Sequence, residues 1–167
     1  VVAMTSPYAL HFASFTHDGG YLNTQASAAF IEIYSTQMRL SQQKADRTAL
    51  VSIGLEKDKR AILPSVRKLA GIGFKIFATE HTHVFLTENG LPNYLIHKIS
   101  ENDKKPNLKD MLSERGFDLI LNTSSGDHTL GEQTDGKYIR DKAIESKTKL
   151  FTDVEVAEKL INRMYEK

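Results

Sequence analysis

Short apolar segments alternate with amphipathic segments over most of this chain, and the alternation limits the folds it can form. The apolar segments have the length of β-strands and span residues 49–55, 74–78, 94–99, 117–122 and 149–151. Apolar residues recur at helical spacing in residues 59–73, 82–88, 107–115, 136–147 and 154–165. Strands that alternate with helices in this way build a mostly parallel sheet with helices packed on it. The sequence therefore predicts an α/β sandwich.

Three details of this pattern can be tested against a structure. Because a proline in the middle of a helix costs about 3 kcal/mol, we expect Pro64 near the first turn of its helix. Residues 117–122, FDLILN, form the most apolar strand, which we expect to be central and buried on both faces. In the helix at 136–147, we expect Ile139, Ala143 and Ile144 to face the core.

The first part of the chain differs from the rest. Residues 1–48 show no strand–helix alternation, although residues 24–43 have a broad apolar face at helical spacing. We therefore expect 1–48 to be an N-terminal arm, or the remnant of a preceding domain, with a helix at 24–43. Residues 49–167 would form the α/β domain. Because position 1 is valine, we expect the chain to be a piece of a longer protein.

Charge and composition exclude several classes of function. The 22 basic and 21 acidic residues leave a net charge of +1, which argues against a nucleic-acid-binding protein. No cysteine is present, so disulfides and thiolate metal sites are excluded. No apolar run approaches the roughly 20 residues of a membrane span, and the N-terminus has no basic region typical of a signal peptide. We expect a cytoplasmic protein, with the mitochondrial matrix as the alternative.

Polar side chains follow four of the predicted strands, where parallel α/β sheets bind their ligands. These residues are Lys59, Thr79, Thr82, Lys98 and the segment 122–126, NTSSG. If Thr79 is the N-cap of its helix, Thr82 is the third helical residue, and both hydroxyls lie beside the free N–H groups of residues 80–82. Together with two lysines, this helix start would form a phosphate-binding site.

Each of these signals has a simpler explanation when it is taken alone. Threonine at a helix start is usually only a cap, and NTSSG could be an ordinary turn after a strand. The sequence shows no evident third metal ligand to join His81 and His83, so we assign no metal site. A triad of Ser125, Asp127 and His128 lacks the expected G-x-S-x-G motif. The combination of polar residues after four strands is the informative observation.

The motifs SIGLEKDK, GFKIFATEHTHVFLTENG, FDLILNTSSGD, YIRDKAIE and LFTD carry a resemblance to a known family. They resemble the methylglyoxal synthase-like domain, most of all the C-terminal regulatory domain of the carbamoyl-phosphate synthase large subunit. The similarity runs from about Ala49 to Ala157. It implies a three-layer sandwich with a five-stranded, mostly parallel sheet and an effector pocket at the strand ends.

The resemblance also implies roles for individual residues. In family members that bind nucleotide monophosphates, the phosphate-binding positions correspond to Lys59, Thr79, Thr82 and Lys98. The loop that contacts ribose and base corresponds to Asn122, Thr123, Ser124, Ser125 and Gly126. Asp127 replaces a residue that is frequently basic in the family. We expect these groups at the rim of the sheet, so that Lys98→Ala or Thr82→Val would weaken phosphate binding by roughly 1.5–3 kcal/mol and leave folding intact.

The function implied is that of a non-catalytic allosteric domain that binds a phosphorylated effector such as UMP or IMP. Its partners would be the ATP-using synthase domains of the parent chain, and the resemblance also allows a glutaminase small subunit and self-association. The domain itself would need no cofactor, whereas the parent enzyme, a ligase of pyrimidine and arginine biosynthesis, would use ATP and magnesium.

The alternative is a methylglyoxal synthase-type lyase acting on dihydroxyacetone phosphate. The position of that enzyme's aspartate base falls near Lys105, and its histidine positions fall near Leu55 and Glu132. A lysine cannot serve as that base at neutral pH without a large downward shift of its pKa. A shift of two residues in the alignment would admit Asp103, and a second aspartate is retained as Asp135. The lyase therefore stays open as an alternative.

Overall fold

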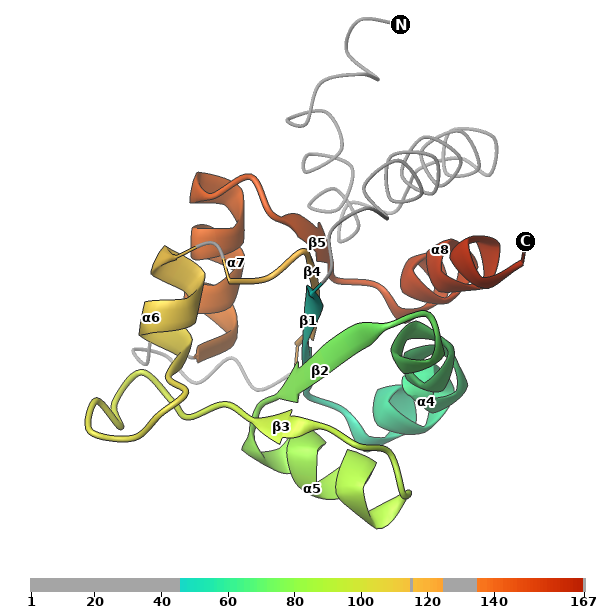
Figure 1. Cartoon of the computed structure of the whole chain (residues 1–167), viewed down its shortest axis with the longest axis horizontal. Helices are drawn as coiled ribbons and strands as arrows, with labels where there is room; N and C mark the ends of the chain where they lie inside the picture. Colours follow the sequence, from blue (N-terminus) through green and yellow to red (C-terminus); the bar gives the residue numbers. More distant parts are fainter. Residues whose placement is uncertain (1–45, 115, 125–134, 167) are drawn as a thin grey trace, which may run out of the picture.

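The computed structural model describes residues 46–114, 116–124 and 135–166. Strands and helices alternate along this part of the chain, as Figure 1 shows. In chain order they are β1 (Arg47–Ile53), α4 (Glu56–Gly71), β2 (Phe74–Ala78), α5 (Glu80–Glu88), β3 (Tyr94–Leu95), α6 (Leu108–Ser113), β4 (Leu119–Thr123), α7 (Asp135–Glu145), β5 (Lys149–Phe151) and α8 (Val154–Tyr165). The alternation predicted from the sequence is confirmed.

The strands form one five-stranded sheet in the order β3-β2-β1-β4-β5. Every neighbouring pair is parallel, so the predicted fold class is confirmed. β4 is buried on both faces as expected, but β1 is the middle strand and β4 lies beside it. Because all strands run the same way, their carboxyl ends meet at one edge of the sheet.

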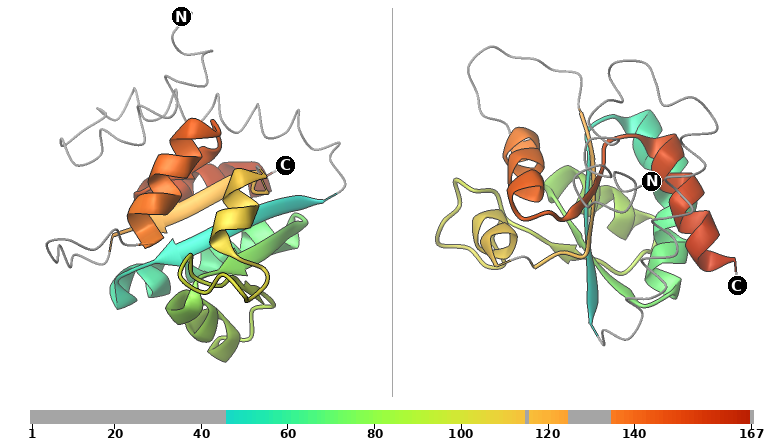
Figure 2. Two further views of the ribbon diagram at one scale, coloured as in Figure 1. Left: turned by 90° about the vertical axis from the view of Figure 1, so that its left-hand side faces the viewer. Right: turned by 90° about the horizontal axis from the view of Figure 1, so that it is seen from above.

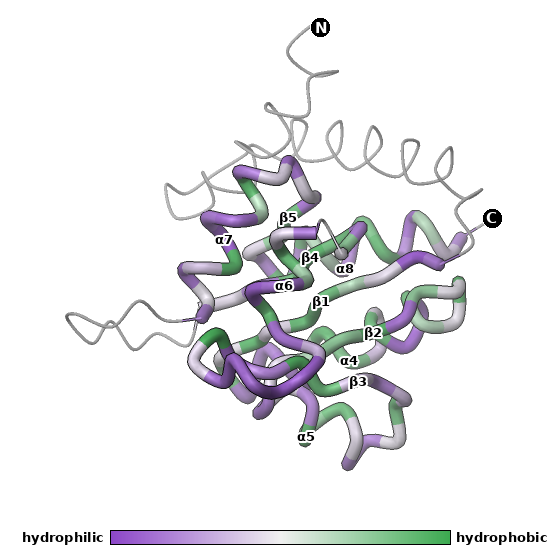
Figure 3. Tube along the Cα trace, turned by 60° about the vertical axis from the view of Figure 1, so that its left-hand side comes forward, coloured by the Kyte–Doolittle hydropathy of each residue, from purple (hydrophilic) through white to green (hydrophobic). Residues whose placement is uncertain are grey.

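Helices cover both faces of the sheet, which gives three layers (Figures 1 and 2). α4, α5 and α8 pack on one face around Val51, Ile76 and Leu121. α6 and α7 pack on the other face around Leu50 and Ile120. Successive residues of a strand point to opposite faces, so the two cores alternate along β1 and β4. Figure 3 shows hydrophobic residues along the strands and hydrophilic residues in the connection from β3 to α6.

Two of the detailed predictions about helices are wrong. Pro64 lies in the middle of α4, because this helix begins at Glu56 and not at residue 59. The buried face of α4, which includes Ile62 and Val66, offsets the hydrogen bond that an interior proline removes. Ile144 is 40% exposed, whereas Ile139 and Ala143 are fully buried on one side of α7. One residue turns a helix by about 100°, which carries Ile144 off that side.

The third strand is much shorter than the predicted segment 94–99. The chain leaves β2 after Leu95, and His97 instead forms an isolated bridge with Asn107. The last helix has the predicted bounds, and Asp153 is its N-cap. The Asp153 carboxylate accepts a hydrogen bond of 2.7 Å from the N–H of Val156.

The predicted arm at 1–48 lies almost entirely outside the described residues, so it stays a prediction together with its helix at 24–43. Only its last residues are described, and Arg47 already belongs to β1. None of the helices in the described ranges is both long enough and apolar enough to cross a membrane.

Candidate functional site

Three polar side chains lie in a row across the carboxyl ends of β2, β1 and β4. The hydroxyl of Thr79, which follows β2, donates to the hydroxyl of Ser52 in β1 at 3.1 Å. Ser52 is in register with Asn122 of β4. All three continue the face of the sheet that α6 and α7 cover, two residues beyond Phe77, Leu50 and Ile120. We call these three residues, Thr79, Ser52 and Asn122, the polar row.

The start of α5 adjoins the polar row. Thr79 is the N-cap residue and Thr82 is the third helical residue, so both predicted positions are confirmed. The Thr79 hydroxyl makes no capping bond within its own helix, because it is directed to Ser52. The first intrahelical bond runs from the N–H of His83 to the carbonyl of Thr79 at 2.7 Å. The N–H groups of the first turn have no acceptor within the helix.

Thr82 is part of the folded core as well as a candidate ligand. Its side chain is only 2% exposed. The hydroxyl oxygen accepts a hydrogen bond of 3.0 Å from the N–H of Ile53, and the hydroxyl donates a longer one of 3.4 Å to the carbonyl of the same residue. This contact ties the start of α5 to the end of β1. The hydroxyl could donate to a ligand only in place of its long hydrogen bond to the Ile53 carbonyl.

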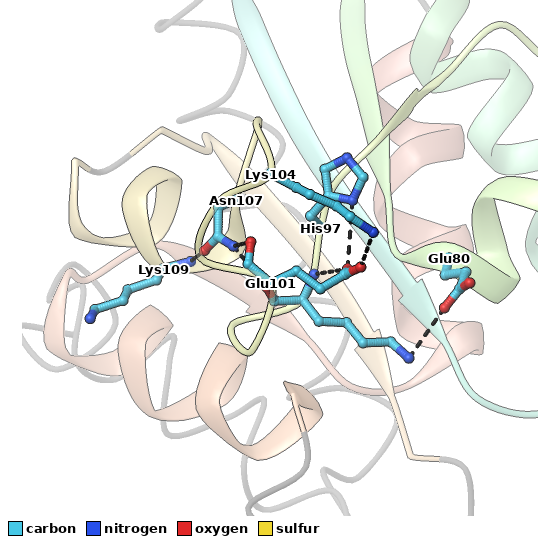
Figure 4. Close-up of polar contacts among 7 residues, drawn as sticks. Glu80, His97, Glu101, Lys104, Asn107 and Lys109 are labelled. Atoms are coloured by element: carbon cyan, nitrogen blue, oxygen red, sulfur yellow. Dashed lines mark hydrogen bonds and ion pairs between the residues drawn. The ribbon is translucent and has the colours of Figure 1, made fainter.

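Lys98 reaches the start of α5 from the connection after β3. Its Nζ lies 3.2 Å from the carboxylate of Glu80, the first residue of α5 (Figure 4). The hydrogen bond and the charge of Glu80 raise the pKa of Lys98 above its usual value, and Asp135 and Glu101 add to this effect. Lys98 therefore pairs with a carboxylate that is carried by the first turn of α5, at the positive end of that helix.

The side chain of Asn107 holds together the connection between β3 and α6, which carries Lys98 (Figure 4). Asn107 is 2% exposed, and its Nδ2 donates to the carbonyls of Lys98 at 2.7 Å and Glu101 at 3.0 Å. Its Oδ1 accepts from the N–H of Lys109 at 2.9 Å and so caps α6. One buried amide thus fixes the backbone from which the Lys98 side chain extends.

Lys59 is the fourth residue of α4 and not the first, because this helix starts three residues earlier than the sequence predicted. Its side chain is 10% exposed, and its Nζ is 3.5 Å from the carboxylate of Glu56 one turn earlier. That distance is at the outer limit of a hydrogen bond. The structure therefore holds a buried cation near the end of β1 with one weak anionic contact among the described residues.

Asn122 is 1% exposed, and its Oδ1 accepts a hydrogen bond of 2.9 Å from Nη1 of Arg140 in α7. The sequence did not identify Arg140. Its neighbour Ile139 marks the buried face of α7, and no pattern signals that a long side chain next to it reaches across to β4. Ser52 was also missed, although a serine inside an otherwise apolar strand was a usable signal.

The remaining candidate residues follow Asn122. Thr123 ends β4, and its hydroxyl is fully buried without a hydrogen-bond partner among the described residues. Ser124 is exposed. Ser125 and Gly126 lie outside the described residues, so their contacts with ribose and base stay a prediction. The expectation of an exposed rim is wrong for three candidates, since Lys59, Thr82 and Asn122 are buried.

The positions considered for a lyase are occupied as follows. Leu55 is the N-cap residue of α4, and Lys105 pairs with Asp110 of α6. Asp135 begins α7 and is close enough to Lys98 to influence its pKa. Glu132 lies outside the described residues. His83 contacts Asn93, with 2.7 Å between its Nδ1 and the amide oxygen, and no group of three potential metal ligands is found in the described part of the chain.

Comparison with known proteins identifies the family. The family model of the MGS-like domain matches residues 61–152, more than half of the chain. The C-terminal section of the carbamoyl phosphate synthase large chain of Methanocaldococcus jannaschii is 40% identical over 90 residues, which are 54% of this chain and 14% of that protein. The corresponding section from Methanopyrus kandleri is 34% identical over 110 residues, 66% of this chain and 19% of that protein.

The complete large chain from Mesorhizobium japonicum is 35% identical over 105 residues, 63% of this chain. The matched part is only 8% of that protein, so the similarity concerns one domain and not the whole synthase. The chain therefore belongs to the MGS-like domain family, and it is homologous to the C-terminal section of the carbamoyl phosphate synthase large chain.

Proposed function

We propose that this domain binds a phosphorylated small molecule, a nucleotide monophosphate such as UMP or IMP, and regulates a carbamoyl-phosphate synthase. The phosphate would lie at the start of α5, between the N–H groups of its first turn, the hydroxyl of Thr79 and the ammonium groups of Lys98 and Lys59. The rest of the effector would lie along the polar row toward Asn122.

The observation that carries this proposal is the contact between Lys98 and Glu80. It brings a cation from the connection after β3 to within 3.2 Å of a carboxylate at the first residue of α5. A helix start and a nearby lysine form a common phosphate-binding arrangement. The Glu80 carboxylate stands in for the anion that we propose, and it is 58% exposed, so it can move aside.

The length of the polar row favours a nucleotide over a triose phosphate. Thr79, Ser52 and Asn122 lie at the carboxyl ends of three adjacent strands. Neighbouring strands are about 4.8 Å apart, so the row spans roughly 10 Å. A ribose and part of a base can extend from the start of α5 to Asn122 over that distance. Dihydroxyacetone phosphate has three carbons and cannot reach both ends at once.

Regulation would follow from a difference in effector affinity between two states of the attached synthase domains. An effector that binds both states equally shifts nothing. Those ATP- and magnesium-using domains, and any glutaminase subunit, would belong to the rest of the parent protein. The isolated chain would have no ligase activity, and the parent enzyme would act in the cytoplasm or the mitochondrial matrix.

The test is a calorimetric titration of the 167-residue chain with UMP, IMP and dihydroxyacetone phosphate, combined with an assay for methylglyoxal. We expect saturable binding of a nucleotide and no methylglyoxal. Lys98→Ala should weaken that binding by roughly 1.5–3 kcal/mol, about 10- to 150-fold, because it removes a charged hydrogen-bond donor. Lys109→Ala is the matched control, since this exposed lysine of α6 extends away from Glu80 in Figure 4.

Three outcomes would contradict the proposal. Formation of methylglyoxal would establish the lyase alternative and would mean that a carboxylate such as Asp103 or Asp135 acts as the base. Equal weakening by Lys98→Ala and Lys109→Ala would show that binding follows surface charge and not this site. If neither UMP nor IMP binds to the folded chain, the nucleotide proposal is wrong.

A further inference from the structure

The side-chain amide of Asn122 is held in one orientation by Arg140. A guanidinium group can only donate hydrogen bonds, so the atom 2.9 Å from Arg140 Nη1 must be the amide oxygen of Asn122. The Nδ2 atom of Asn122, which carries two N–H donors, then lies on the side of the amide away from Arg140. Nothing among the described residues accepts a hydrogen bond from this Nδ2, and it is not among the fully buried atoms without a partner.

Gly136, at the start of α7, also lies near the Asn122 amide. A methyl group placed on Gly136 would lie 3.4 Å from Nη1 of Arg140 and 3.6 Å from Nδ2 of Asn122. These are ordinary van der Waals distances for a methyl group that glycine lacks, so Gly136 itself lies about one methyl group away from the pair. Arg140 and Gly136 both belong to α7, so the helix that supplies the donor to Asn122 also runs close beside its amide.

We propose that Arg140 is a positioning residue that fixes the amide of Asn122 so that this end of the polar row offers only hydrogen-bond donors. This inference rests on the proposed function, because it concerns the part of the ligand distal to the phosphate. That part must offer an acceptor, such as a sugar hydroxyl oxygen or a carbonyl oxygen of a base, roughly 10 Å from the start of α5. Ligands that offer only N–H donors there would leave Asn122 without a partner.

The first test needs no ligand and follows the side-chain NH₂ resonances of Asn122 by NMR in the 167-residue chain. In the unaltered chain we expect two well-separated proton signals at fixed positions. Arg140→Met should move both toward the values of a freely rotating asparagine. Arg140→Lys should restore them in part, because an ammonium group can still donate to the oxygen. Lys142→Met is the control for loss of charge on the same helix, since Lys142 pairs with Glu145 and not with Asn122.

The second test compares two probes by calorimetry. UMP reaches both ends of the polar row, whereas inorganic phosphate reaches only the start of α5. We expect Arg140→Met to weaken UMP binding about tenfold and to change phosphate binding by less than about twofold, since one hydrogen bond distal to the phosphate is lost. Asn122→Asp should have the same selective effect and should fold, because a carboxylate keeps the contact with Arg140 and offers the ligand no donor.

Each outcome decides the proposal. Unchanged Asn122 signals in Arg140→Met would show that the amide is positioned without the arginine and would overturn it. Equal weakening of UMP and phosphate would make Arg140 a direct phosphate ligand, which also overturns it. If the unaltered chain binds neither probe, the proposed function fails, and the NMR test still decides whether Arg140 positions Asn122.

Discussion

Replacement of Thr82 by valine tests whether this residue holds the fold together as well as lining the site. The substitution keeps the shape of the side chain and exchanges the hydroxyl for a methyl group. In the structure that hydroxyl accepts from the N–H of Ile53 at 3.0 Å, and both residues are buried. Valine would therefore leave a buried backbone donor without this acceptor at the junction of β1 and α5.

The expected loss of stability follows from two opposing contributions. Leaving the Ile53 N–H without its acceptor costs about 1–3 kcal/mol. Burying the extra methyl group of valine returns about 0.8 kcal/mol. The net loss should be about 0.2–2 kcal/mol, which for a chain of this size lowers the melting temperature by up to roughly 8 °C. This result would replace the sequence-based expectation that folding is unaffected.

Urea unfolding followed by circular dichroism measures the free energy, and hydrogen exchange followed by NMR measures the Ile53 amide itself. Exchange at Ile53 should accelerate in Thr82→Val more than at core amides of β1 such as Leu50. Thr82→Ser is the control, because it loses a methyl group but keeps the acceptor, so Ile53 should stay protected. Stability within about 0.5 kcal/mol of the unaltered chain, with unchanged exchange at Ile53 in Thr82→Val, would refute the reasoning.

Two further predictions concern the charged groups near Lys98. Glu80→Gln removes the carboxylate that pairs with Lys98. Because an exposed ion pair contributes about 0.2–1 kcal/mol, phosphate or UMP binding should tighten about 1.4- to 5-fold, and a calorimetric titration that finds weaker binding would contradict this. The ammonium group of Lys104 lowers the pKa of Glu101 through a hydrogen bond of 2.6 Å, aided by the N–H of Lys98. Lys104→Met should raise that pKa toward its ordinary value in an NMR titration, and the stabilisation by these contacts, present at neutral pH, should be lost as the pH falls through the lowered pKa.

The sequence predicted the order and type of the elements well, because each strand is a short apolar run bounded by turn residues. Residues 74–78 and 149–151 match β2 and β5 at both ends. The errors occur where tertiary contacts override local preference. Packing of α4 on the sheet tolerates Pro64 inside the helix. After Leu95 the backbone no longer pairs with β2. It is held instead by the buried side chain of Asn107, which donates to the carbonyl of Lys98, and β3 is therefore short.

In the candidate site, too, the sequence predicted some residues, and tertiary contacts that it does not reveal determined others. The rule that parallel strands gather ligand-binding residues at their carboxyl ends selected Thr79, Lys98 and Asn122 from the sequence. It could not show that Glu80 forms an ion pair with Lys98, because an ion pair between two exposed side chains leaves no periodic pattern in the sequence. It also could not identify Arg140, which enters the site across the layer between α7 and β4.

Burial decides which substitutions can test binding cleanly. Thr82 and Asn122 each make a hydrogen bond that the fold needs, so loss of binding in their variants must be separated from loss of stability. Lys98 and Glu80 are about half exposed and contact each other, so neither supports the core. Their variants should shift affinity in opposite directions at constant stability, since one removes the proposed cation and the other removes its competitor. Opposite shifts of this kind are hard to produce by unfolding, which makes the Lys98 and Glu80 pair the most direct probe of the anion site.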